Sequence, residues 1–174
     1  CNLFDAIARR AARRPQSPAL IPPGREVLDY RTLLERSARI AHVLAAHGVR
    51  PGDRVMVQVE KSAEGLCLYL ACLRAGAVYV PLNNAYTAAE LAYFAADADP
   101  RIFVCAPAAR QTVAAVTKAH ILTLDDDGRQ GSLLEECAGQ AAEFPSADIG
   151  MNHVAVIIYT SGTTGRSKGA MLPH

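Results

Sequence analysis

The chain has 174 residues, of which 51% are hydrophobic and 20% charged, and its net charge is +1. The near balance of charges argues against a nucleic-acid binder, which usually carries a basic surplus, and the apolar fraction excludes a disordered chain. No run of 18 residues is free of charged side chains, so we expect no membrane span. The five cysteines form no Cys-x-x-Cys pair and do not cluster with the five histidines. We therefore predict free thiols, no structural metal and a cytoplasmic setting.

Apolar periodicity and capping residues predict the elements of the first half of the chain. We expect an amphipathic helix over residues 2–14, capped by Asn2, with Leu3, Ile7 and Ala11 on its buried face. A targeting presequence is the alternative for this Arg-rich start, and the acidic Asp5 argues against it. The segments that follow are predicted as short strands at 18–22 and 26–29, a helix at 31–47, a strand at 54–60, a helix at 62–75 and a strand at 77–82.

The second half continues the alternation of helices and strands. Thr87 and Glu90 have the spacing of a capping box and open a helix predicted over 88–97. Beyond it we predict a strand at 101–105, a helix at 107–119, a strand at 120–124, a polar turn at 125–131, a short helix at 132–138, a loop at 139–151 and a strand at 153–159. This alternation predicts an α/β fold with a largely parallel β-sheet flanked by helices.

An unusual run, YTSGTTGRSKG, follows the last predicted strand over residues 159–169. Glycines let the backbone approach a ligand closely, and successive N–H groups in such a turn form an anion-binding concavity. Hydroxyl groups donate to phosphate oxygens or bind Mg²⁺, and Lys168 adds a positive point charge. The run therefore predicts a polyphosphate site, with a flexible loop between two strands as the alternative. Its spacing differs from the P-loop of NTPases, and no G-x-G-x-x-G occurs.

The same run resembles the phosphate-binding signature of the AMP-forming acyl-CoA synthetases. These belong to the adenylate-forming superfamily, which includes luciferases and peptide-synthetase adenylation domains. Further segments that resemble the family lie at 29–33, 52–55 and 73–83. The segments most similar to the malonyl-CoA synthetase branch lie at 60–62, 68–70 and 84–87. Asn152 and Pro173 depart from the family, which often has Asp and Ser there.

The resemblance implies that a small carboxylate is activated with ATP and Mg²⁺ to an acyl-adenylate, which CoA then converts to a thioester. Residues 1–174 would be the N-terminal portion of the AMP-binding domain, with the rest of the enzyme chain as their partner. The implied ATP-phosphate ligands are Thr160, Ser161, Gly162, Thr163, Thr164, Gly165 and Lys168. Thr160 is also the implied Mg²⁺ ligand, while catalytic residues and the CoA site are expected elsewhere in the enzyme.

Two alternatives to a malonate-specific ligase stay open. One is another acyl-CoA ligase or an adenylation domain, and the other is a nucleotide-binding module without catalysis. In either enzyme reading we expect the 174 residues alone to be inactive. The run Asp125-Asp126-Asp127 could suggest a cation site, but Gly128 and Arg129 follow it, so we predict a polar turn.

Overall fold

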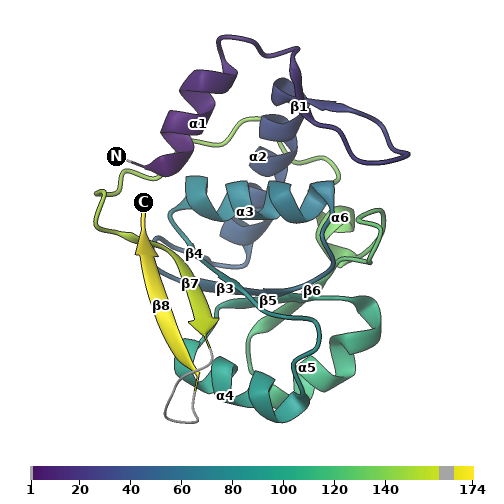
Figure 1. Ribbon diagram of the computed structural model, residues 1–174, viewed down its shortest axis with the longest axis vertical. Helices are drawn as coiled ribbons and strands as arrows, with labels where there is room; N and C mark the ends of the chain where they lie inside the picture. The colour runs from purple at the N-terminus through teal and green to yellow at the C-terminus, as the bar shows by residue number, and fades with distance from the viewer. Residues whose placement is uncertain (1, 161–166) are drawn as a thin grey trace.

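The computed structural model describes residues 2–160 and 167–174. A six-stranded sheet crosses the middle of the molecule, with helices on both sides (Figure 1). The elements in chain order are α1 (Leu3–Ala11), β1 (Pro18–Leu20), β2 (Leu28–Asp29), α2 (Tyr30–Ala46), β3 (Arg54–Gln58), α3 (Ala63–Ala75), β4 (Val78–Pro81), α4 (Ala88–Ala98), β5 (Ile102–Cys105), the 3₁₀ turn η1 (Pro107–Ala109), α5 (Arg110–Val116), β6 (His120–Thr123), α6 (Ser132–Cys137), β7 (Val154–Thr160) and β8 (Lys168–Pro173).

The strands of the large sheet lie in the order β6-β5-β3-β4-β7-β8. The first five in this order are parallel to one another, and β8 pairs antiparallel with β7. In chain order, β3 and β4 pair first, and β5 and β6 are then added on the other side of β3. Strand β7 is added next to β4. The predicted α/β fold with a largely parallel sheet is thus confirmed.

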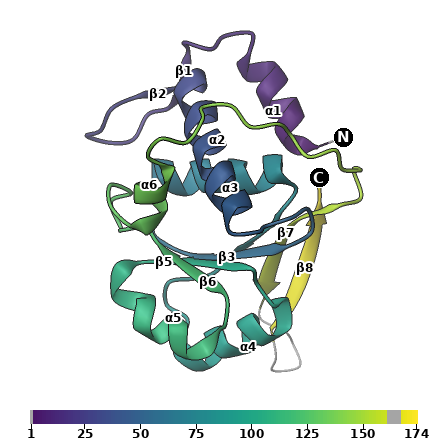
Figure 2. The same cartoon turned by 180° about the vertical axis from the view of Figure 1, so that it is seen from behind.

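The helices form two layers that bury the two faces of the sheet. Figures 1 and 2 show α1, α2, α3 and α6 on one side, and α4 with α5 on the other. The alternating side chains of β3 divide between two hydrophobic clusters, because successive residues of a strand point to opposite faces. Val55 and Val57 belong to the α2–α3 side and Met56 to the α4–α5 side. This central strand is therefore buried on both faces.

Side-chain caps fix where four of the helices begin. Asn2, Asp29, Ser62 and Thr87 each accept a hydrogen bond from a backbone N–H in the first turn of their helix. Helix α3 ends at Gly76, whose φ of 71° is the left-handed conformation that glycine adopts without strain. The predicted cap of α1 by Asn2 and the predicted capping box of α4 are both confirmed.

Three expectations about the elements need correction. The buried face of α1 carries Phe4 and Ala11, while Leu3 is 37% exposed. Helix α1 packs on α3 through the face that holds Phe4, and this turns Leu3 toward solvent. The helix predicted over 107–119 is shorter, consisting of η1 and the seven residues of α5. Strand β8 was not expected, and its six exposed residues explain why no burial pattern indicated it.

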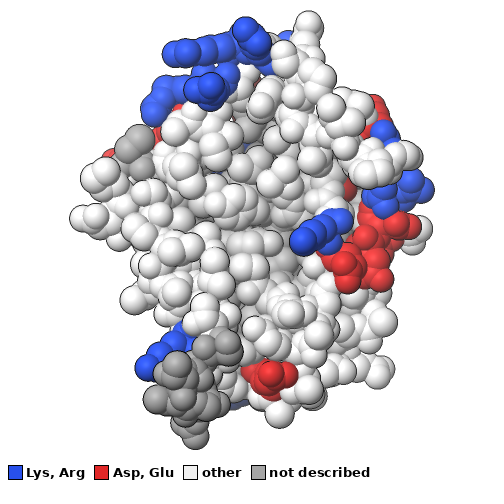
Figure 3. Space-filling view, in the orientation of Figure 1, with Lys and Arg blue, Asp and Glu red and all other residues white. Residues whose placement is uncertain are grey.

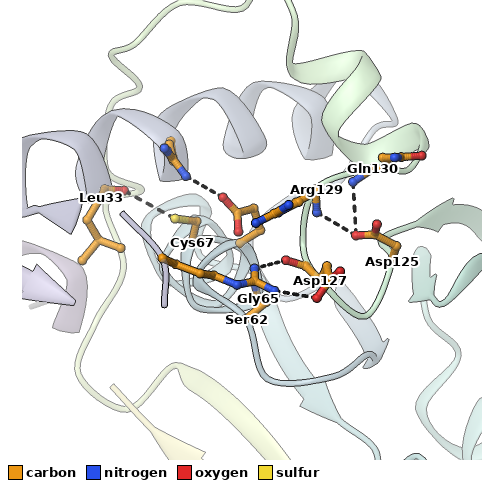
Figure 4. Close-up of polar contacts among 11 residues, drawn as sticks. Leu33, Ser62, Gly65, Cys67, Asp125, Asp127, Arg129 and Gln130 are labelled. Carbon is orange, nitrogen blue, oxygen red and sulfur yellow. Dashed lines mark hydrogen bonds and ion pairs between the residues drawn. The ribbon is translucent and has the colours of Figure 1, made fainter. Parts of the chain in front are cut away.

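The predicted polar turn over residues 125–131 packs against the start of α3 (Figure 4). Asp125 Oδ1 accepts hydrogen bonds from the backbone N–H groups of Arg129 (2.7 Å) and Gln130 (3.1 Å), which hold the pKa of Asp125 below its usual range. Asp127 forms an ion pair with Arg25 at 2.6 Å. Two of the three carboxylates are thus bound by groups of this chain, and the predicted polar turn is confirmed.

Basic charge gathers far from the end of the sheet where β7 stops. In Figure 3 basic side chains cover the region of α1, and Arg9 and Arg10 of its last turn are exposed. The end of β7 and the start of β8 lie at the opposite end of the molecule (Figure 1). In the part of the chain that the structure describes, no helix is both long and apolar enough to cross a membrane.

The four described cysteines are free thiols, as predicted, and three of them are buried. Burial raises the pKa of the Cys67 thiol to about 12 and that of Cys105 to about 11. These thiols therefore stay protonated at neutral pH and pack as small apolar side chains.

Candidate phosphate-binding site on the hairpin of β7 and β8

The predicted phosphate-binding run lies where β7 leaves the parallel sheet. In an open α/β sheet, ligands bind outside the carboxyl ends of the parallel strands. Val156 of β7 is level with Tyr79 of β4, so β7 continues about two residues past the end of β4 before it stops at Thr160. The run thus begins at the carboxyl edge of the sheet.

Thr160 and Lys168 are the two predicted site residues whose positions are described. They are paired in the β7–β8 register, so the last residue of one strand lies beside the first residue of the other. The Thr160 hydroxyl donates to the Lys168 carbonyl at 3.5 Å, and both side chains are exposed. A residue with a hydroxyl group and one with an ammonium group are therefore paired where the two strands end. The other five predicted phosphate ligands lie outside the described residues: Ser161, Gly162, Thr163, Thr164 and Gly165.

Tyr159 fastens the end of β7 to α4. Its side chain is 7% exposed, and its ring lies against Phe94 with 4.4 Å between the ring centroids. The Tyr159 hydroxyl donates to Asp97 Oδ2 at 2.6 Å. Burial, and next the hydrogen bond to Asp97, raise the pKa of Tyr159, so the phenol stays neutral and remains a donor.

Tyr93 makes the corresponding contact at the start of β8. Its hydroxyl donates to the Ser167 carbonyl at 3.0 Å, and its side chain is 36% exposed. Neither Tyr93 nor Asp97 was among the expected site residues. No local pattern could have found them, because Tyr93 and Ser167 are 74 residues apart in the chain.

Gly169 allows β8 to lie close over β7. A Cβ atom at Gly169 would come within 2.9 Å of Ile157 Cγ2 and 3.5 Å of Tyr159 Cε1. The glycine at the end of the run therefore has a packing reason that is separate from any contact with phosphate.

A second group of titratable side chains joins α2, β6 and α6. His47 Nε2 lies 2.5 Å from Glu136 Oε2, and the rings of His47 and His120 are stacked at 3.8 Å with 20° between their planes. The potential ligand atoms of the three residues all lie within 4.8 Å of one another. Imidazole lone pairs lie in the ring plane, so two stacked rings cannot both direct them at one ion. The arrangement is that of a hydrogen-bonded pair beside a stacked ring, and the absence of a structural metal stays a prediction.

Proteins related in sequence include enzymes of two kinds. AmbB, the AMB antimetabolite synthetase of Pseudomonas aeruginosa, is 39% identical over 173 residues, which are 99% of this chain and 13% of AmbB. A feruloyl-CoA synthase of an Amycolatopsis species is 37% identical over 166 residues, or 95% of this chain and 32% of that enzyme. The chain therefore spans a third or less of these curated relatives.

One solved structure is similar to this chain in both fold and sequence. The structure of ATP-bound MatB from Rhodopseudomonas palustris superimposes with a TM-score of 0.94 at 47% identity, and covers 99% of this chain and 35% of MatB. The AMP-binding enzyme family matches residues 7–174, nearly the whole chain. The fold is that of the N-terminal domain of adenylate-forming enzymes. The chain belongs to the AMP-binding enzyme family, that of the adenylate-forming acyl-CoA ligases and adenylation domains.

Proposed function

We propose that the full-length protein is an acid–CoA ligase that activates malonate with ATP. The carboxylate attacks the α-phosphate of ATP, which gives malonyl-adenylate and pyrophosphate, and the CoA thiol then displaces AMP to give the thioester. Residues 1–174 supply the phosphate-binding part of the AMP-binding domain. The CoA site and the residues that bind the acyl group belong to the remainder of the enzyme.

The observation that carries this proposal is the pairing of Thr160 with Lys168 at the carboxyl edge of the sheet. The seven residues between them include the five other proposed phosphate ligands. A lysine ammonium here stabilises the negative charge that develops on the leaving pyrophosphate. Because the ammonium is charged while the phosphates are bound and while they leave, Lys168 serves binding and the transition state together.

Thr160 suits a magnesium ion that is held mainly by the nucleotide. Mg²⁺ prefers hard oxygen ligands and commonly binds through one or two protein groups together with substrate phosphates. The Thr160 hydroxyl is exposed at the strand end, and its hydrogen bond to Lys168 is long enough to be exchanged readily. The ion would neutralise phosphate charge while the carboxylate approaches.

Malonate is proposed as the acid on sequence grounds. The three segments at 60–62, 68–70 and 84–87 resemble malonyl-CoA synthetases, and the 47% identity to MatB exceeds the 37–39% identity to the feruloyl-CoA synthase and AmbB. The free thiols of the described cysteines fit the cytoplasmic setting that we propose.

Replacing Lys168 tests the proposal directly. We expect Lys168→Ala to lower malonate-dependent exchange of pyrophosphate into ATP in the full-length protein by about 10²–10³-fold, the usual loss for one preorganised electrostatic contact. Lys118→Ala removes an equally exposed lysine elsewhere and should change the rate by less than about twofold. Equal rates for the Lys168→Ala variant and the parent would contradict the assignment of Lys168.

The adenylation-domain alternative predicts a different acceptor for the acyl group. A CoA ligase releases a free thioester when CoA is added, whereas an adenylation domain transfers the acyl group to a carrier-bound thiol. Assaying both acceptors with malonate, ferulate and amino acids separates these candidates. We further propose that residues 1–174 alone catalyse no exchange, and malonate-dependent turnover by the isolated chain would refute this.

A further inference from the structure

One helix holds both ends of the connection that carries the phosphate-binding run. Tyr93 and Asp97 are four residues apart in α4, so they lie on the same face, one turn apart. Asp97 accepts the Tyr159 hydroxyl at 2.6 Å, one residue before the connection leaves β7. Tyr93 donates to the Ser167 carbonyl at 3.0 Å, one residue before β8 begins.

Both contacts involve α4, a helix that is packed firmly into the core. Phe94 lies between them on α4, is 1% exposed and contacts the Tyr159 ring at 4.4 Å and the Tyr93 ring at 5.5 Å between centroids. Helix α4 is itself fixed by its capping box and by the buried residues of the α4–α5 side of the core. Phe94 therefore aligns both tyrosines, and the two hydrogen bonds connect the hairpin to an element that cannot shift easily.

Pairing between β7 and β8 does not by itself fix the orientation of the strand ends at Thr160 and Lys168. Where the two strands end, the Thr160 hydroxyl donates a long hydrogen bond of 3.5 Å to the Lys168 carbonyl, and every residue of β8 is exposed. Past the end of β4, among the described residues, β7 pairs with β8 alone, and a two-stranded pairing with little burial is marginally stable without packing against another element. The contacts to α4 supply that packing at the two points where the strands give way to the connection.

We infer that Tyr93 and Asp97 are positioning residues for the bound ATP phosphates, acting through Ser167 and Tyr159. This inference rests on the proposed function. Holding both ends of a phosphate-binding segment before ATP arrives reduces the conformational entropy lost on binding. It also limits how far the backbones of Thr160 and Lys168 can move relative to α4. Neither Tyr93 nor Asp97 needs to touch the nucleotide for this effect.

Variants that remove one hydrogen-bonding group each test the inference in the full-length protein. Tyr93→Phe removes only the donor to Ser167, and Asp97→Ala removes the acceptor for Tyr159. Each should raise the KM for Mg·ATP in pyrophosphate exchange about three- to tenfold, the range for one net hydrogen bond, with kcat changed less than about twofold. Asp97→Asn keeps an acceptor oxygen and should restore the KM to within about twofold of the parent.

Tyr86→Phe is the matched control. The Tyr86 ring also packs on Phe94, with 4.9 Å between centroids, but within the described chain its hydroxyl has no hydrogen-bond partner. Its removal should leave the KM unchanged. Hydrogen exchange without nucleotide gives a second readout: Tyr93→Phe and Asp97→Ala should both speed amide exchange in a peptide spanning Thr160–Gly169, and Tyr86→Phe should not.

The outcomes distinguish this inference from the proposed function. Raised KM with faster exchange in Tyr93→Phe and Asp97→Ala, and recovery in Asp97→Asn, supports the inference. A normal KM in both variants, even with faster hydrogen exchange or a lower Tm, overturns it while the proposed function stands. If the parent protein shows no ATP-dependent exchange with any acid, the proposed function fails, and the positioning role for ATP fails with it.

Discussion

At the scale of single residues, the space around Gly169 shows how closely β8 approaches β7. The ring of Tyr159 and the side chain of Ile157 occupy the volume that any larger residue at position 169 would need. Tyr159 is in turn held from the other side by Phe94 and Asp97. A side chain at position 169 would therefore disturb the contact that fastens β7 to α4.

We expect Gly169→Ala to lower the free energy of unfolding by about 1–3 kcal/mol, because the added methyl overpacks Ile157 and Tyr159. Gly150→Ala is the control, since a Cβ at Gly150 has no heavy atom within 4 Å and its φ is not positive. That variant should be neutral or slightly more stable. Urea unfolding of both variants measures the difference, and equal stabilities would contradict the overpacking argument.

At the scale of elements, carboxylates and hydroxyls at helix starts decide where the chain enters each helix. Asp29 accepts the backbone N–H of Thr32 at 2.7 Å at the start of α2, and this bond holds the pKa of Asp29 below its usual range. Glu90 accepts the backbone N–H of Thr87 at 2.8 Å at the start of α4, and its pKa is lowered for the same reason. Both caps are local in sequence, and both act through the ionised form.

The lowered pKa values predict how stability changes in acid. A carboxyl group whose pKa is lower in the folded than in the unfolded state stabilises the fold fully above the unfolded value of about 4. This contribution is lost as the pH falls through the folded-state pKa. We therefore expect the Tm of the parent chain to fall more steeply below about pH 4 than that of the double variant Asp29→Asn/Glu90→Gln. Thermal scans between pH 6 and pH 3 test this, and parallel curves would refute it.

At the scale of the whole molecule, one buried arginine ties together segments from both ends of the chain. Arg74 of α3 donates to the carbonyls of Leu34 and Phe144 at 2.9 Å each and to Ser37 Oγ at 3.0 Å. Its guanidinium group lies 4.3 Å from the ring centroid of Phe4. Burial lowers the pKa of Arg74 to about 10, so the group is still charged at neutral pH. Through Arg74, α1, α2, α3 and the loop at 139–151 are joined on one side of the sheet.

Arg74→Lys should therefore destabilise the chain although it keeps the charge. A lysine ammonium cannot reproduce the planar fork that reaches the carbonyls of Leu34 and Phe144 together, nor the stacking on Phe4. We expect a loss of about 1–3 kcal/mol in the free energy of unfolding, the range for leaving buried acceptors without a donor. Arg13→Lys at an exposed position should change it by less than about 0.5 kcal/mol. Equal unfolding midpoints for the two variants would contradict this role.

The sequence predicted most of the element order because the signals involved are local. The capping box of Thr87 and Glu90, the glycine that ends α3 and the apolar strands each act within a few residues, so they can be read without the fold. The site was predicted from the same kind of signal, the run at 159–169. What could not be predicted was β8, since its residues are all exposed and its assignment depends on pairing with β7.

The sequence by itself determined the α/β class, the largely parallel sheet and the run whose glycines, hydroxyls and lysine suit a polyphosphate. Only the tertiary structure decided what stands next to that run, the antiparallel β8 and the two hydrogen bonds with α4. It also decided the group of His47, His120 and Glu136, which involves β6 at the other edge of the sheet. The physical reason is separation along the chain. Tyr159 and Asp97 are 62 residues apart, and Tyr93 and Ser167 are 74 apart. Contacts of this kind follow from the packing of α4 against the sheet, which no short stretch of sequence specifies.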